Sequence, residues 1–367
     1  MSNRADDITR LHWIEAAKGL GVMFVILVHS IIPIVNPVTI HLSSFTIPLF
    51  FILAGLTYNN TKHQKNLGAF ISSRARQYLI PYFLLYVIIM TMFVPLASTV
   101  DTYLTPDQLL FWFLYGNGPP NSAMHLWFLP VLFLGMVLFV ISDRVLKDAP
   151  MAARWLLVVT FPVVAVLIQS LFAPNLVPWR LSSAFLAATF VLLGNEMRRV
   201  RELKPWGATS VPRTTAMLVI LVVFLIFTSN LNGFTDIAVD NYGVNAWLYI
   251  LNGTIGTILV FSASSLLLRF SDTRRLLMAL GANSQEVYEI HPVTFYLIPL
   301  VALLVGFPIT DPILMYNLWP ARFVIGIAIS VPLASRVLTQ SKFLSFLFRG
   351  SFQPRIVPTS AQGSQTV

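Results

Sequence analysis

Long apolar runs separated by short polar segments dominate this chain. A helix needs about 20 mostly apolar residues to cross the hydrocarbon core of a bilayer. A shorter aromatic run at 109–115 is expected to lie in the membrane interface, where aromatic rings are favoured. The pattern therefore predicts an all-α, polytopic membrane bundle of about ten transmembrane helices. The predicted spans lie near 13–35, 42–59, 78–98, 125–143, 154–173, 179–197, 214–231, 245–268, 283–306 and 318–339.

Polar sequence flanks this apolar region at both ends. Residues 1–345 are predicted to form one transmembrane domain. Residues 346–367, which are rich in Ser, Gln and Pro, are predicted to form a disordered cytoplasmic tail. The first apolar run contains Glu15 and Lys18 and does not end at a small-residue cleavage site, so we expect a retained helix and not a signal peptide.

The composition agrees with a membrane protein. Hydrophobic residues make up 56% of the 367 residues and charged residues only 11%, whereas a soluble domain carries about a quarter charged residues. The chain has no cysteine, which excludes disulfides, a cysteine nucleophile and thiolate metal sites. The six histidines form no closely spaced pair of metal-ligand type, and no basic stripe is interleaved with aromatic residues. We therefore expect neither a metal site nor nucleic-acid binding.

The net charge of +9 follows from topology. Lysine and arginine collect in cytoplasmic loops of membrane proteins. With the N-terminus placed in the cytoplasm, all of the 24 basic residues except Lys18, Arg180 and Arg322 fall in cytoplasmic segments. This asymmetry predicts an even number of helices, cytoplasmic N- and C-termini, and a multi-pass protein of the cell inner (plasma) membrane.

The first predicted helix carries ionisable residues, which are costly inside a bilayer. Lys18 and His29 are 11 residues apart, close to three helical turns, so both lie on one face, separated by about 16 Å along the axis. Glu15 is three residues before Lys18 and can pair with it. Gly19 and Gly21 permit close approach of another backbone or of a ligand. Glu15 and Lys18 could alternatively serve only as headgroup anchors, with Lys18 snorkelling to the interface.

The ninth and tenth predicted helices also contain ionisable residues. Glu289 and His291 are about 200° apart on a helix and point to different sides. Pro292 is predicted to break or kink the helix beside His291, freeing carbonyl groups that would line a polar cavity. A purely structural kink, with His291 bonded to a freed carbonyl, is the alternative. Arg322 lies just inside the tenth span.

Five segments occur in this order along the chain: WIEAAKGLGVMFVILVHS (13–30), FFILAGLTY (50–58), SRARQYLIPYF (73–83), HLWFLPVLF (125–133) and GANSQEVYEIHP (281–292). They resemble motifs of the integral-membrane acyltransferase family 3, bacterial O-acyltransferases that include polysaccharide O-acetylases and fucose 4-O-acetylase-like proteins. Glu15, Lys18 and His29 match the order and spacing of the family's first-helix motif. The chain has Lys18, Ala54 and Gln77 where many members have Arg, Ser and Arg.

The resemblance implies transfer of an acyl group, usually acetyl, from acetyl-CoA at the cytoplasmic face to a hydroxyl of a cell-envelope glycan or lipid-linked sugar, without a metal. His29 is then the candidate general base, because histidine titrates near neutral pH, and Lys18 and Glu15 are the other candidate catalytic residues. The candidates for binding the phosphates of coenzyme A are Arg74, Arg76 and Lys18. The candidates for binding the acceptor are His125, Trp127, Glu289, His291 and Arg322.

Other interpretations remain open at this stage. The two arginines could serve topology alone, and Trp127 equally suits an interfacial aromatic belt. A transporter or flippase of an envelope saccharide would also use many helices and intramembrane charges. A structural or regulatory membrane protein would use those charges only to hold helices together. The sequence leaves open the acceptor, the acyl chain, the oligomeric state and whether an acyl-histidine intermediate forms.

Overall fold

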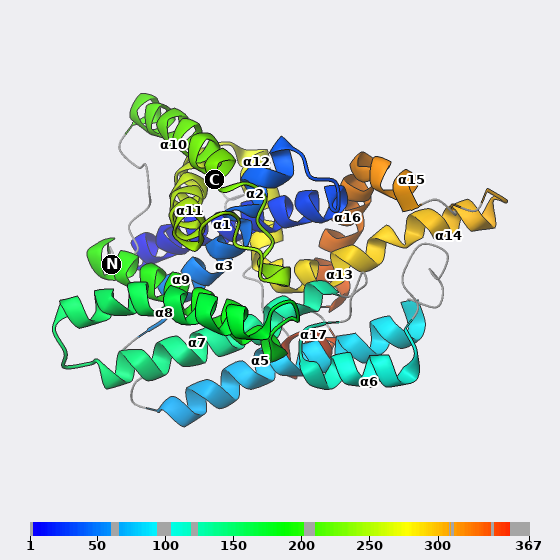
Figure 1. Ribbon diagram of the computed structural model, residues 1–367. Coiled ribbons are helices and arrows are strands. Elements are labelled where there is room, and N and C mark those ends of the chain that lie inside the picture. The colour runs from blue at the N-terminus through cyan, green and yellow to red at the C-terminus, as the bar shows by residue number, and fades with distance from the viewer. Residues whose placement is uncertain are drawn as a thin grey trace.

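The computed structural model describes residues 3–59, 66–93, 104–118, 124–201, 210–307, 309, 312–338 and 341–352. Every named element of secondary structure in these ranges is a helix (Figure 1). The α-helices are α1 (Asn3–Ile31), α2 (Pro37–Ser43), α3 (Thr46–Thr57), α5 (Leu67–Ile88), α6 (Pro106–Tyr115), α7 (Phe128–Val145), α8 (Met151–Phe172), α9 (Leu181–Arg201), α10 (Val211–Asn232), α11 (Ala246–Leu267), α12 (Ser271–Ala282), α13 (Ser284–Phe295), α14 (Leu297–Leu304), α15 (Pro312–Asn317), α16 (Trp319–Leu333) and α17 (Lys342–Arg349). Short 3₁₀ or π segments are η1 (Ile89–Phe93), η3 (Met124–Trp127), η4 (Pro178–Arg180), η5 (Ile237–Val239) and η6 (Ala334–Leu338).

Within the described residues, nine helical segments are long and apolar enough to cross a membrane. The predicted all-α, multi-pass architecture is therefore confirmed. The sixth predicted span, 179–197, corresponds to α9, which is not among the nine. α9 packs against α3, α7 and α8 and buries several polar side chains, which lower its hydropathy. Its buried polar residues are Ser182, Ser183, Thr189, Asn195 and Glu196.

The third helix begins earlier than predicted. α5 starts at Leu67, 11 residues before the predicted span 78–98. Residues 94–98 of that span lie outside the described residues. The Asn66 side chain caps it by accepting a hydrogen bond from the Ala69 N–H at 2.9 Å. Arg74 and Arg76, which precede the predicted span 78–98, therefore lie on its helix. The apolar pattern missed these turns because their polar side chains face the interior cavity described below.

Two predicted spans are each built from two helical pieces. The second span comprises α2 and α3, and it begins at Pro37, earlier than predicted. The ninth comprises α13 and α14, which meet at Tyr296. The helix runs through Pro292, so the break predicted beside His291 lies four residues beyond the proline. The short aromatic helix α6 buries none of its residues, as expected for an interfacial segment.

Helix α1 is the centre of the bundle and contacts α3, α11, α12, α13 and α16 (Figure 1). Its contact with α12 depends on two glycines. A Cβ on Gly19 would collide with the Leu277 carbonyl, and a Cβ on Gly281 would collide with the Glu15 carbonyl. The two backbones therefore approach closely, as the sequence suggested for Gly19. This contact fixes the segment of α1 that carries Lys18.

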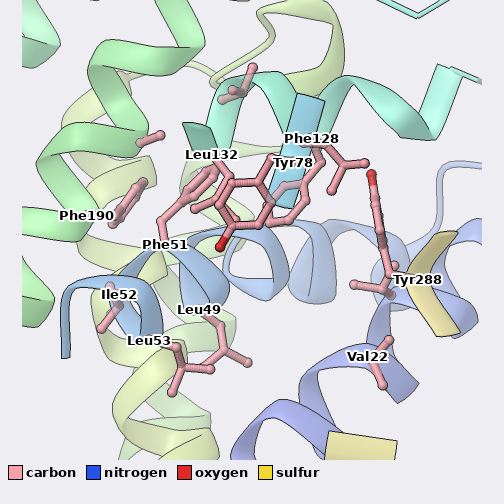
Figure 2. Close-up of a cluster of buried hydrophobic side chains, with 14 of the residues drawn as sticks. Val22, Leu49, Phe51, Ile52, Leu53, Tyr78, Phe128, Leu132, Phe190 and Tyr288 are labelled. Carbon is pink, nitrogen blue, oxygen red and sulfur yellow. The ribbon is translucent and has the colours of Figure 1, made fainter. Parts of the chain in front are cut away.

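The interior is filled by aromatic and branched side chains from helices far apart in sequence. Figure 2 shows part of this core, with Phe51 and Leu49 of α3, Phe128 of α7 and Phe190 of α9 among its members. The outer helices instead expose large apolar residues, for example Leu171 of α8 at 83%. An apolar exterior around a packed interior is what lipid as the surrounding solvent requires.

The C-terminal helix α17 crosses the boundary at 345/346 predicted between the membrane domain and the tail. It contacts α5 and buries Leu347 and Phe348. Residues 353–367 of the predicted tail lie outside the described residues.

Candidate active site

A cavity of about 880 Å³ lies within the bundle. α1, α3, α5, α7 and α13 supply most of its wall, and the end of α17 closes one side. The charged part of its lining, called the mouth below, comprises Lys18, Arg74, Arg76, Glu286 and Arg349. The apolar part of the lining that precedes the histidines described next, called the closed end, comprises Val25, Ile47, Phe50, Phe128 and Tyr288.

The wall contributed by α1 follows one stripe of that helix. Ile14, Lys18 and Val25 line the cavity, with spacings of four and seven residues that keep them on one face. His29 comes four residues after Val25 and continues the same stripe. The imidazole of His29 therefore lies one helical turn beyond the last residue of α1 that lines the cavity.

Two other histidines stand in the same relation to the cavity. On α13, Tyr288 lines the closed end, and His291 follows it by three residues. Phe128 begins α7 and lines the closed end, and His125 of η3 precedes it by three residues. Neither these histidines nor His29 line the cavity itself. Three helices thus each place an imidazole one turn beyond its closed end.

The three imidazoles form one cluster. The His29 and His291 rings are stacked, with centroids 5.0 Å apart and planes at 14°, and the His125 ring is 6.1 Å from that of His291. His29 Nδ1 lies 2.7 Å from His291 Nε2. His291 is fully buried, whereas His29 is half-buried. The cluster joins residues 262 positions apart in the sequence.

The hydrogen bonds define which ring nitrogen of His29 is basic. His291 Nδ1 lies 3.1 Å from the Val287 carbonyl oxygen, which can only accept, so this nitrogen carries the proton. His291 Nε2 is then an acceptor, and His29 Nδ1–H donates to it. His29 Nε2 is left with a lone pair and, among the described residues, no hydrogen-bond partner. This arrangement is that of a neutral imidazole oriented by a second imidazole.

Tyr288 and His125 link the cluster to the closed end. The Tyr288 hydroxyl donates to the His125 carbonyl, and His125 Nε2 donates to the Glu289 carbonyl oxygen at 3.1 Å. The Tyr288 and Phe128 rings lie edge to face with centroids 5.2 Å apart, and both are visible in Figure 2. These two rings form the floor that separates the cavity from the imidazoles.

Arg322 holds the end of α1 that carries His29. Its Nη2 donates to the His29 carbonyl at 3.0 Å, and its Nη1 donates to the Ser30 carbonyl at 2.9 Å. Its guanidinium also lies 4.6 Å from the centre of the Phe295 ring. A cation at a helix C-terminus satisfies carbonyls that lack intrahelical partners. The predicted acceptor-binding residue Arg322 thus bonds to the backbone of the base candidate.

The mouth contains both paired and unpaired cations. Lys18 Nζ lies 2.7 Å from Glu15 Oε1, as expected from their spacing. Arg74 Nη1 donates to Gln77 at 2.5 Å, and its side chain, like that of Arg76, has no carboxylate partner among the described residues. Lys18, Arg74 and Arg76, the three predicted donor-binding residues, therefore line one cavity. Lys18 and His29 share a face of α1, but only Lys18 lines the cavity.

Two other predicted acceptor residues lie beside the cluster. Trp127 is only 4% exposed and stacks under the Arg180 guanidinium at 5.7 Å, which does not suit an interfacial belt residue. Glu289 is fully buried, and its Oε1 accepts a hydrogen bond from Gln285 at 3.0 Å. Its side chain points away from His291, as the 200° separation predicted. Only its carbonyl oxygen contacts the imidazole cluster, through His125.

Sequence reasoning missed two residues near the site. Arg180 is buried, its Nε and Nη2 donate to the Asn117 carbonyl, and its Nη1 has no partner. Its backbone has a positive φ of 45°. It was the one basic residue predicted on the outer side, which was a signal for a special role.

The second missed residue is Arg349, which was assigned to the tail but lines the mouth. The amphipathic pattern of segment 342–349 was the signal that it forms a docked helix.

A separate group of charges, all buried except the exposed Arg199, has its partners within the protein. Arg154 lies 2.8 Å from Asp143 and 3.7 Å from Glu196, and Arg199 lies 3.4 Å and 3.5 Å from the same two carboxylates. These residues belong to α7, α8 and α9 and do not line the cavity. Two arginines balance two carboxylates, so this network joins helices and has no charge left for a ligand.

Comparison with known proteins gives one match. A family model described as an acyltransferase domain matches residues 11–336. No curated protein and no protein of solved structure matches the chain.

Proposed function

Because the chain belongs to the integral-membrane acyltransferase family 3, whose domain covers residues 11–336, we propose that it transfers an acetyl group from acetyl-CoA to a hydroxyl of a cell-envelope glycan or lipid-linked sugar. Acyltransferase activity in a membrane protein follows from the family. The donor, the acceptor, the inner-membrane location and the cytoplasmic termini are part of the proposal.

One observation carries this proposal. A single cavity has cations at its mouth and three imidazoles one helical turn beyond its closed end. Coenzyme A carries several phosphate groups at one end and the reactive thioester at the other. Cations at the mouth suit the phosphates, and the apolar wall between Val25 and Leu132 suits the uncharged arm. The thioester would then arrive at the floor formed by Phe128 and Tyr288, next to the imidazoles.

His29 performs the proton transfer in this scheme. Its Nε2 takes the proton of the acceptor hydroxyl as the hydroxyl oxygen attacks the thioester carbonyl carbon. The new C–O bond forms, the C–S bond breaks, and the imidazolium returns its proton to the departing sulfur. The products are the acetyl ester and the free thiol of coenzyme A, and no external oxidant or reductant is needed.

His291 and Arg322 are positioning residues in this scheme. His291 accepts the Nδ1–H of His29 and thereby keeps Nε2 unprotonated and correctly oriented. Arg322 fixes the last turn of α1 through two backbone carbonyls. His125 belongs to the cluster and lies two residues before Trp127, which stacks with Arg180, and we assign this part of the site to the acceptor.

The side chains that close the cavity favour a short acyl group. Val25, Phe50, Phe128 and Tyr288 close the cavity before it reaches His29. Only the carbonyl end of the thioester has to pass these side chains for transfer to occur. A two-carbon acyl group needs the least displacement of the rings, which supports acetyl as the donor group.

The test uses purified protein in lipid vesicles with acetyl-CoA labelled on the acetyl group. An acyltransferase releases free coenzyme A and moves the label to an added envelope glycan fraction or to water. A saccharide transporter or flippase would move the glycan across the vesicle membrane without consuming acetyl-CoA. Glycan movement with no donor consumption, under conditions where the protein is folded, would overturn the proposal.

A further inference from the structure

The C-terminal helix α17 brings a fourth cation to the mouth of the cavity. The Ser341 side chain caps its start by accepting from the Leu344 N–H. Gly350 ends it in the left-handed conformation, with φ of 62°. A Cβ on Gly350 would collide with the Arg76 carbonyl. The helix end therefore lies directly against α5, and Arg349 lines the cavity beside Arg76.

Arg349 uses only part of its guanidinium in this position. Its Nε donates to Glu286 Oε1 of α13. Neither terminal nitrogen bonds to a described residue, and neither is among the enclosed, unpartnered polar atoms. The side chain is 18% exposed, whereas that of Glu286 is only 2% exposed. Arg349 thus has donors free toward the cavity, in the forked geometry that suits a phosphate group.

The docking of α17 does not depend on this ion pair alone. Gln285 Nε2 donates to the Phe348 carbonyl at 2.9 Å and to the Gln77 carbonyl at 3.3 Å, which links α13, α17 and α5. Leu347 and Phe348 are buried. Since these contacts hold the helix in place, the Arg349 side chain can change its partner while α17 stays docked.

The charges at the mouth give a reason for such a change. Four cations line the mouth, Lys18, Arg74, Arg76 and Arg349, and among the described residues two of them have a carboxylate partner: Lys18 pairs with Glu15 and Arg349 with Glu286. Two cations therefore remain without a carboxylate partner, fewer than the negative charges that coenzyme A carries. Arg349, like Lys18, is a paired cation with free donors, so an anionic donor at the mouth would compete with Glu286 for it.

We propose that Arg349 exchanges Glu286 for a phosphate of the acyl donor, so that the C-terminal helix is part of the donor site. This inference rests on the proposed function. Glu286 then acts as a placeholder that neutralises Arg349 while the site is empty, and its carboxylate opposes donor binding. If the Arg349–Glu286 ion pair only held α17 in place, removal of either partner would change the affinity for coenzyme A in the same direction.

The experiment measures the binding of coenzyme A to the purified full-length protein by calorimetry. Arg349→Gln is expected to weaken binding about tenfold, the usual scale of one charge-assisted contact. Glu286→Gln is expected to strengthen binding about threefold or more, because it removes the competing carboxylate. Lys342→Gln is the matched control: it removes a positive charge from the exposed start of the same helix and should leave binding unchanged.

A phosphate-free probe, S-acetylpantetheine, separates charge from fold. Both site variants should bind it as the unaltered protein does. Weaker coenzyme A binding in Glu286→Gln, or unchanged binding in Arg349→Gln, would overturn the inference. If Arg349→Gln does not fold, Glu286→Gln and Arg349→Lys decide the matter, since the lysine variant retains a cation and should bind more tightly than Arg349→Gln. Failure of the unaltered protein to bind coenzyme A would instead refute the proposed function.

Discussion

The two ends of the cavity are built on different principles. At the closed end, His29 and His291 are hydrogen-bonded to each other, and His291 and His125 each bond to a backbone carbonyl. At the mouth, Arg76 and the terminal nitrogens of Arg349 have no partner within the described residues. Hydrogen-bonded imidazoles define one geometry, whereas free cations leave capacity for a ligand.

This difference separates chemistry from binding. A group that acts on the reacting atoms affects kcat, and a group that holds a distant part of the substrate equally in the ground and transition states affects KM. Substitutions at the closed end should therefore lower kcat with little effect on donor affinity. Substitutions at the mouth should do the opposite.

The strongest test of this contrast is His29→Ala. Loss of the general base should lower kcat about 1,000-fold, while coenzyme A still binds with unchanged affinity. The assay is label transfer from acetyl-CoA, with calorimetry for binding. His41→Ala is the matched control, because His41 also makes one hydrogen bond between helices, at 2.7 Å to Ser229, and lies outside the site. Normal acetyl transfer by His29→Ala would show that His29 is not the general base.

A third region, the ion network of α7, α8 and α9, should respond in stability alone. Asp143→Asn leaves Arg154 and Arg199 without their closest carboxylate and should lower the free energy of unfolding by about 3 kcal/mol. Unfolding in detergent measures this change. Donor KM and kcat of the folded fraction should stay the same; a large rise in KM would mean that the network belongs to the donor site.

His291→Phe should lower kcat between about 10- and 100-fold, because His29 loses the acceptor that orients its ring. His291→Gln keeps an acceptor oxygen and should recover part of the lost rate. Donor KM is the readout that should not move in either variant. Equal rates in the Phe and Gln variants would show that His291 serves packing and not orientation.

The smallest expected effect belongs to the mouth. Arg76→Gln should raise the donor KM about tenfold, the scale of one charge-assisted contact, and leave kcat unchanged. Arg275→Gln provides the comparison, since Arg275 is an exposed arginine of α12 that does not line the cavity. A fall in kcat without a change in KM would place Arg76 in the chemistry and erase the distinction between the two ends.

The sequence alone determined the local features of this protein. Backbone groups in lipid must bond within their own helix, so long apolar runs predict spanning helices, and nine of the ten predicted spans correspond to described helices long and apolar enough to cross a membrane. Neighbours three or four residues apart were equally predictable, and the Glu15–Lys18 pair formed as expected. The family followed from five short segments, and the match over residues 11–336 confirmed it. The hydropathy pattern did not predict the early start of α5, because the polar first turns of this helix face a cavity that the sequence does not show.

Only the tertiary structure decided which helix faces meet. The contact of His29 with His291 joins positions 262 residues apart, and Arg349 reaches the mouth because Gly350 lets α17 lie against α5. α9 illustrates the same point, since Ser182 and Ser183 bond to Asp240, a partner 58 and 57 positions away that the hydropathy of α9 cannot reveal. Helix formation in a membrane is a local requirement of the backbone, whereas the site depends on packing between side chains of distant segments.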